Sequence, residues 1–156
     1  DEMWDSAAGL FTSGTYAWAA LGSNSISNDS NTLKISEGDN HEGAKLFFSD
    51  AADLSANLVV GTTYKLTFDA KISDATDPTH VRVVATVEPQ VEITTTGFQS
   101  YSLYFVATAT TTNYIRLNGL GDGEDLWIDN LSLKAVNGNS GIMTAMAASD
   151  IVTDTP

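Results

Sequence analysis

Hydrophobic and polar residues alternate with a period of two along most of this chain. The clearest case is residues 62–73, in which every second position from Tyr64 to Ile72 is apolar and the positions between them are polar. This alternation predicts a β-strand with one buried and one solvent-facing side. Residues 81–87 and 101–107 repeat the pattern. Shorter strands are predicted at residues 16–21, 32–36, 44–49, 91–95, 113–118 and 126–134.

Turn-forming residues separate the predicted strands. Gly, Asn, Asp or Pro residues occur at 37–40, 60–61, 74–78, 96–97 and 119–123. No window of a dozen residues carries a helical period, and only residues 50–58 indicate a short helical turn. Many short strands at this spacing are typical of a sandwich or barrel. We therefore predict an all-β fold, an antiparallel β-sandwich of the jelly-roll type with about eight to ten strands.

The chain divides into two parts. Residues 1–136 contain every predicted strand and form one domain. Residues 137–141, Asn-Gly-Asn-Ser-Gly, form a flexible joint, and residues 142–156 form an extended C-terminal tail. Its larger apolar residues include Met143, Met146, Ile151 and Val152. They are too few to fold alone, so the tail is disordered, packs on its own domain, or reaches a neighbouring subunit.

Residues 126–133, Leu-Trp-Ile-Asp-Asn-Leu-Ser-Leu, carry an acidic residue in the middle of a predicted strand. The apolar residues before the central Asp129-Asn130 pair share one parity, and those after it share the other. Such a switch predicts a β-bulge. A buried carboxylate inside a strand is costly unless a cation, backbone N–H groups or water satisfy it. A bulge that holds an acid late in an all-β chain indicates a binding module rather than an enzyme.

Composition narrows the classes of function. The 156 residues include 20 acidic and 7 basic residues, a formal net charge of −13. This acidity argues against contact with nucleic acid and with anionic membranes, and it favours calcium or neutral ligands. The absence of cysteine excludes disulfides, thiolate catalysis and cysteine-bound zinc. With its many Thr, Asn, Gly and Ser residues, the chain fits a bacterial or viral surface protein, so we expect an extracellular or virion-surface location.

Four segments in a fixed order carry a resemblance to a known family. They are Gly-Ala-Lys-Leu at 43–46, residues 58–71, residues 96–107 and Trp-Ile-Asp-Asn-Leu-Ser-Leu at 127–133. Together they resemble the jelly-roll carbohydrate-binding modules of the glucan- and xylan-binding kind, in the galactose-binding-like superfamily. The resemblance covers residues 30–134 and implies a non-catalytic module that binds glycans. The chain, which is rich in Thr, Ala and Asn, and its tail also resemble domains of tailed-bacteriophage virion proteins, which implies host attachment.

The resemblance also implies a structural calcium ion. In such modules the acid of the final Asp-Asn-x-Ser-Leu motif helps to hold the ion, which points to Asp129 here. The other ligands come from an N-terminal segment, and residues 11–16 of this chain lack an acid. Calcium prefers six to eight oxygen ligands, so this departure matters. The alternative interpretation is that Asp129 accepts backbone N–H groups at the bulge.

Sugar binding in this fold uses aromatic rings that stack on pyranose rings, with polar side chains that bond the hydroxyl groups. The aromatic candidates are those out of phase with the core pattern or sharing one side of an early strand. They are Tyr104, Trp127, Trp18 and Tyr16, with Arg82 and Gln90 as polar candidates. Each tryptophan also has a competing interpretation as a core residue, because both sheets of a jelly roll bury their inner faces.

No motif in the sequence indicates catalysis. There is no Gly-x-Ser-x-Gly elbow, no His-Glu-x-x-His and no phosphate loop. Two hypotheses therefore stand. The first is a non-catalytic, surface-exposed glycan-binding module of a virion or cell-surface protein. The second is a structural or assembly module whose C-terminal arm docks on a neighbouring subunit, in a homo-oligomer or among other virion subunits, with no sugar binding.

Overall fold

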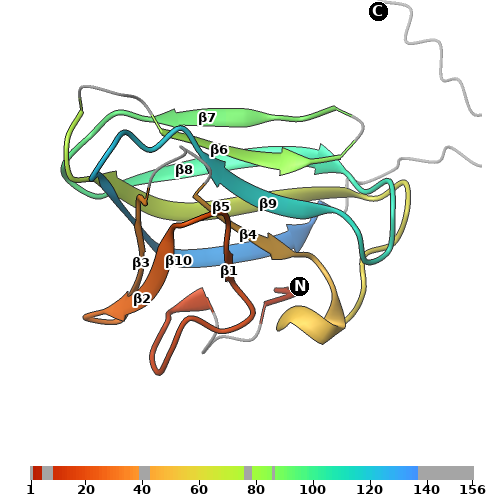
Figure 1. Ribbon diagram of the computed structural model, residues 1–156. Helices are drawn as coiled ribbons and strands as arrows, with labels where there is room; N and C mark the ends of the chain where they lie inside the picture. Colours follow the sequence, from red (N-terminus) through yellow and green to blue (C-terminus); the bar gives the residue numbers. More distant parts are fainter. Residues whose placement is uncertain (1, 5–8, 39–42, 76–78, 86, 137–156) are drawn as a thin grey trace, which may run out of the picture.

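The computed structural model describes residues 2–4, 9–38, 43–75, 79–85 and 87–136, which form two β-sheets packed face to face (Figure 1). The elements are β1 (Ala19–Ala20), β2 (Ser25–Asp29), β3 (Thr32–Ser36), β4 (Ala44–Phe47), η1 (Asp50–Ala52), β5 (Thr63–Ile72), β6 (Thr79–Val84), β7 (Gln90–Ile93), β8 (Gln99–Val106), β9 (Tyr114–Asn118) and β10 (Asp125–Ala135). The predicted joint and tail at 137–156 lie outside the described residues. Within the described part, no helix is long and apolar enough to cross a membrane.

Each sheet has five strands, and all neighbouring strands are antiparallel. Sheet I has the order β1-β4-β9-β6-β7, and sheet II has the order β2-β3-β10-β5-β8. The predicted jelly-roll sandwich is therefore confirmed. Most connections from β4 onwards cross between the sheets, so strands that are adjacent in one sheet come from distant parts of the sequence (Figure 1).

The core lies between the two sheets and follows the alternation in the sequence. On β5, every second residue from Tyr64 to Ile72 is at most 1% exposed. Burying each such large apolar side chain stabilises the fold by about 1.5–3 kcal/mol. Phe105 of β8 stacks on Tyr64 and on Phe48, with ring centroids 5.7 Å and 5.3 Å apart. The inner faces thus form one continuous apolar layer that holds the outer faces in place.

Several strand boundaries differ from the predictions. The strand predicted at 16–21 is reduced to β1, and β6 ends at Val84, so Val87 lies outside the strand and is 77% exposed. The edge strand β2 was missed, because Ile26 is its one large apolar residue. β2 joins β3 through Ser30 and Asn31, whose φ values of 56° and 66° are those of a tight hairpin turn.

The predicted β-bulge in β10 is confirmed. The register between β10 and β5 shifts between Asp129 and Ser132, and Asn130 has a φ of 50°. The bulge adds a residue to one strand, so Leu131 and Leu133 return to the core side that Ile128 also faces. The four apolar residues that differ in parity therefore all pack in one core.

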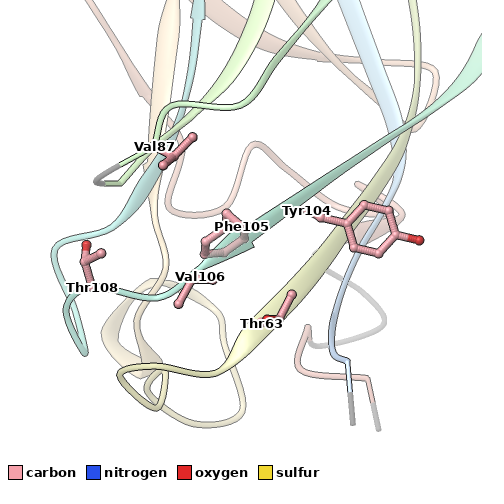
Figure 2. A pocket seen from close by; sticks show the side chains of 6 residues that line it. All are labelled: Thr63, Val87, Tyr104, Phe105, Val106 and Thr108. Carbon is pink, nitrogen blue, oxygen red and sulfur yellow. The ribbon is translucent and has the colours of Figure 1, made fainter. Parts of the chain in front are cut away.

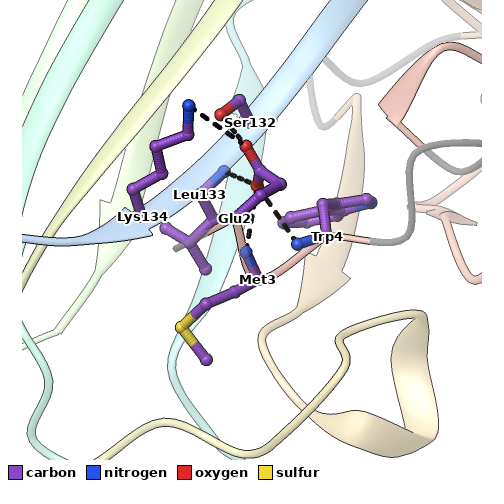
Figure 3. Close-up of polar contacts among 6 residues, drawn as sticks. All are labelled: Glu2, Met3, Trp4, Ser132, Leu133 and Lys134. Carbon is purple, nitrogen blue, oxygen red and sulfur yellow. Dashed lines mark hydrogen bonds and ion pairs between the residues drawn. The ribbon is translucent and has the colours of Figure 1, made fainter.

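The N-terminal segment is attached to β10 by the carboxylate of Glu2 (Figure 3). Its Oε1 accepts hydrogen bonds from the backbone N–H groups of Met3, Trp4 and Leu133, at 3.1, 3.1 and 2.9 Å. Its Oε2 accepts the hydroxyl of Ser132 and lies 3.7 Å from the Nζ of Lys134. Burial would raise the pKa of Glu2, but the hydrogen bonds outweigh it and lower the pKa. Glu2 thus holds the buried Trp4 against the sandwich.

Candidate functional site

The outer face of sheet I carries a concentration of polar and aromatic side chains that the core does not require. Along β4, β6 and β9 one residue in two is buried, so the residues between them point outward. We call this surface the arginine face. Its side chains are Lys45, Phe47, His80, Arg82, Gln90, Glu92, Tyr114, Arg116 and Asn118.

Three cationic residues form one row across this face. Arg116 on β9 lies directly opposite Lys45 on β4 and opposite Arg82 on β6. Gln90 on β7 continues the row beyond Arg82. Like charges in directly opposite positions destabilise a sheet, by up to about 1 kcal/mol for each pair. Opposed cations of this kind impose a repulsion that the rest of the sheet has to offset.

Polar atoms on this face lack partners. The Nε atoms of Arg82 and Arg116 and the Oδ1 of Asn118 are shielded from solvent and have no hydrogen-bond partner in the described structure. Leaving a shielded donor or acceptor unsatisfied costs about 1–3 kcal/mol. The only ion pair of Arg82 within the described residues is a long one, 3.4 Å from its Nη1 to the exposed Glu88. The face therefore holds hydrogen-bonding capacity that the described residues do not use.

Two aromatic rings lie beside the cationic row. Tyr114 is directly opposite Phe47, with ring centroids 5.2 Å apart and planes inclined by 56°. Phe47 is 38% exposed, and the Nζ of Lys45 lies 5.1 Å from the centre of its ring. On the other side of the row, the Nε2 of His80 is 3.3 Å from the Oε1 of Glu92. Rings and polar groups side by side form the kind of surface that a pyranose ring binds.

The structure brings together two of the six residues predicted to bind sugar. Arg82 and Gln90 are direct cross-strand partners on the arginine face. The sequence analysis missed Phe47, Tyr114 and Arg116. Their signal was present, because each has the outward parity in a predicted strand, but the strand order that joins them is not visible in the sequence.

The two early aromatic candidates do not lie together on one face of a strand. Trp18 is 5% exposed and belongs to the core, which corrects its assignment as a platform. Tyr16 lies before β1 with a φ of 50°, and its hydroxyl is 3.3 Å and 3.2 Å from those of Thr12 and Ser13. The two residues do not share one side of a strand, because the only strand within 16–21 is β1, which begins at Ala19.

Trp127 lies on the outer face of sheet II, on the opposite side of the sandwich from the arginine face. It is opposite both Lys34 and Lys71, whose Nζ atoms are 5.3 Å and 4.6 Å from its ring centre. Its Nε1 donates a 2.9 Å hydrogen bond to Asp29. This hydrogen bond helps to lower the pKa of Asp29. Two lysines and Asp29 thus contact Trp127 within the chain, and sugar binding by Trp127 stays a prediction.

Tyr104 borders an apolar hollow of about 500 Å³ at the free edge of sheet II (Figure 2). Tyr104 is 53% exposed, and Val106 beside it on β8 is 50% exposed. Val87 approaches from the connection between β6 and β7, with Thr63 and Thr108 at the rim (Figure 2). The hollow has few polar groups, so it suits an apolar chain segment better than a sugar.

Asp129 is half-buried on the outer face of sheet II, directly opposite Asp69. Its Oδ1 accepts the backbone N–H of Asn130 at 2.8 Å, as the alternative to calcium expects. Burial, together with the charge of Asp69, raises the pKa of Asp129. The Nδ2 of Asn130 donates to Asp69 at 2.7 Å.

The described residues contain no group of three or more acidic, histidine or cysteine side chains placed to hold a metal ion. Calcium needs six to eight oxygens, so the Asp129–Asp69 pair does not fit a calcium site by itself. Calcium binding stays a prediction.

Comparison with known proteins identifies the fold. The CBM22-1 xylan-binding domain of Paenibacillus barcinonensis Xyn10C superposes with a TM-score of 0.61 at 9% identity, covering 83% of this chain and 92% of that one. A family 16 carbohydrate-binding module gives 0.57 at 16% identity, with 81% and 96% covered. TmCBM61, in complex with β-1,4-galactotriose, gives 0.55 at 15% identity, with 86% and 99% covered. No family model and no curated protein matches the sequence.

Proposed function

We propose that this chain is a non-catalytic glycan-binding module of a cell or virion surface, and that the arginine face is its binding surface. The observation that carries the proposal is the row of Lys45, Arg116 and Arg82 beside the Phe47–Tyr114 ring pair. The similar folds of three solved carbohydrate-binding proteins support it. Similarity of fold alone does not assign a ligand, so the site has to carry the argument.

Each part of the face supplies one element of sugar recognition. The ring pair of Phe47 and Tyr114 covers the apolar side of a pyranose. The guanidinium groups of Arg82 and Arg116 donate hydrogen bonds, and the amides of Gln90 and Asn118 both donate and accept. These side chains stand on paired strands of sheet I, so the backbone that carries them is fixed by the sheet, and ligand sites are usually preformed in this way.

The test is glycan-array binding of the purified chain, run with calcium and with a chelator. We expect binding that is lost in Tyr114→Ala and in Arg116→Gln. Tyr104→Ala is the matched control, because it removes an exposed aromatic ring from sheet II and leaves the arginine face intact. Thermal unfolding verifies that each variant is folded. If binding is lost in Tyr104→Ala but kept in Tyr114→Ala, the ligand binds sheet II rather than the arginine face, which would contradict the proposal.

A second function, assembly, is favoured by a different observation. Val136, Thr63 and Val106 form the last outward row of sheet II, and the hydrogen bond from the Val136 N–H to the Thr63 carbonyl fixes one end of it. The other end borders the apolar hollow. Residues 137–156 follow Val136 in the sequence and include apolar residues, and the lining of the hollow is also apolar. In this alternative, the hollow binds the C-terminal segment of a neighbouring copy.

The alternative is tested by oligomeric state. Light scattering is expected to show an oligomer for the full chain and a folded monomer for residues 1–136. Val106→Asp places a charge at the hollow and is expected to dissociate the oligomer without truncation. A full chain that is monomeric at high concentration would exclude this arrangement.

A further inference from the structure

We propose that the arginine face selects acidic glycans, in which a sugar carboxylate occupies the cationic row, over neutral glycans of the same backbone. This inference rests on the proposed function and adds the class of ligand. It also differs from the expectation of neutral ligands drawn from the total charge. Total charge acts at long range, whereas a bound ligand is selected by the groups it touches.

The distribution of cations favours this ligand. Only 7 Lys and Arg residues oppose 20 acidic ones in the whole chain. Four of the seven lie on the outer face of sheet II, and the other three stand side by side in the row of Lys45, Arg116 and Arg82. Neighbouring strands are about 4.8 Å apart, so both flanking cations are close to Arg116. An anion above Arg116 removes the repulsion that this row imposes on the sheet.

The pairing of the charges leaves the centre of the row open. Glu88, in the connection between β6 and β7, pairs with Arg82, and Glu92 on the face pairs with His80. Neither Arg116 nor Lys45 has a carboxylate partner among the described residues, and the Nε of Arg116 lacks any hydrogen-bond partner there. The anionic partner that Arg116 lacks among the described residues is the one that a ligand would bring.

Hydrogen-bond chemistry separates an acidic sugar from a neutral one. Arginine and lysine side chains only donate, whereas a sugar hydroxyl both donates and accepts. A sugar hydroxyl that lies over three such side chains therefore finds no acceptor for its proton among those three. A carboxylate only accepts, and arginine binds it with two parallel hydrogen bonds. Tyr114 is two residues from Arg116 on the same strand, about 7 Å along it, so it can stack on a sugar ring of the same ligand.

The experiment compares one oligosaccharide in two forms by isothermal titration calorimetry. The acidic form is a hexuronate oligosaccharide, and the neutral form is its carboxyl-reduced derivative, which keeps the backbone and linkages. We expect the acidic form to bind at least about tenfold more tightly, with an advantage that shrinks at high salt. Arg116→Gln should remove measurable binding of the acidic form, as it removes binding on the glycan array.

Lys71→Gln is the charge-matched control, because it removes one positive charge from the outer face of sheet II. It should leave both affinities unchanged. If the wild type binds the two forms equally and Arg116→Gln loses that binding, this inference is overturned and the proposed function stands. Binding to neither form, nor to any glycan on the array, would overturn both. Equal binding of a sulfated oligosaccharide would overturn the inference in favour of unselective attraction of anions.

Discussion

Replacing Arg116 with glutamine should make the protein more stable while it removes glycan binding. Arg116 lies opposite Lys45 and Arg82, so the wild-type sheet contains two directly opposed pairs of like charges. Its Nε is also shielded and unpartnered in the described structure. Glutamine removes the charge and the guanidinium Nε and keeps a polar side chain of moderate length. Proteins commonly accept such losses of stability at functional sites.

The size of the expected gain in stability follows from the two opposed pairs of like charges and the unpartnered Nε. Each pair of opposed like charges costs about 0.2–1 kcal/mol, so two pairs cost about 0.4–2 kcal/mol. The unpartnered Nε adds about 1 kcal/mol or more. Loss of packing by the arginine methylene groups offsets part of the gain. We expect a net gain in the free energy of unfolding of about 0.5–2 kcal/mol, or about 2–4 °C in Tm for each kcal/mol.

The assay is urea denaturation at neutral pH and low salt, read by tryptophan fluorescence. Lys34→Gln is the control, because its Nζ is 2.9 Å from Asp125 and the substitution breaks an ion pair rather than a repulsion. We expect that control to be slightly less stable than the wild type, by about 0.5 kcal/mol. Loss of 1 kcal/mol or more in Arg116→Gln would show that Arg116 supports the fold, and would refute the reasoning.

Four further predictions concern the stability of the fold and the binding of calcium. Glu2→Gln should destabilise the protein by about 1–2 kcal/mol. The pKa of Glu2 is lowered in the folded state, so the stabilisation by Glu2 is complete above the ordinary pKa of 4.5 and is lost as the pH falls through the lowered pKa. Denaturation measured as a function of pH should therefore show the wild type and Glu2→Gln becoming equally stable in acid. Asp129→Asn should stabilise the protein at neutral pH, since the raised pKa of Asp129 means that folding disfavours its charged form, and the gain should disappear as the pH falls through that pKa. If calcium binds at Asp129, calcium raises the Tm of the wild type but not of Asp129→Asn; no response in either protein would contradict the calcium prediction. Gly43→Ala should cost about 2 kcal/mol or more in thermal unfolding, because Gly43 has a φ of +72° and a Cβ there would lie 2.2 Å from the carbonyl oxygen of Leu117; an unchanged Tm would contradict it.

The sequence was sufficient for features that depend on neighbouring residues. The alternation in residues 62–73 predicted β5 to within a residue at each end, and residues 32–36 coincide with β3. The parity switch at Asp129-Asn130 located the bulge of β10. Side-chain direction in a strand has a period of two, so the side that faces the core can be read locally. Where the apolar signal was weak, as in β2, the strand was missed.

The candidate site depended on the tertiary structure. Arg82 and Gln90 were predicted as ligand-binding residues. Arg116 and Phe47 became candidates only from the strand order, because β9 lies between β4 and β6 and brings them onto one face. Trp18 was a candidate sugar-binding residue, but it is buried in the core. The sequence by itself therefore determined the all-β class, most strand positions and the bulge, because these follow from local periodicity. The tertiary structure decided which outward residues share one face, because sheet order and register are set by packing between segments distant in the chain.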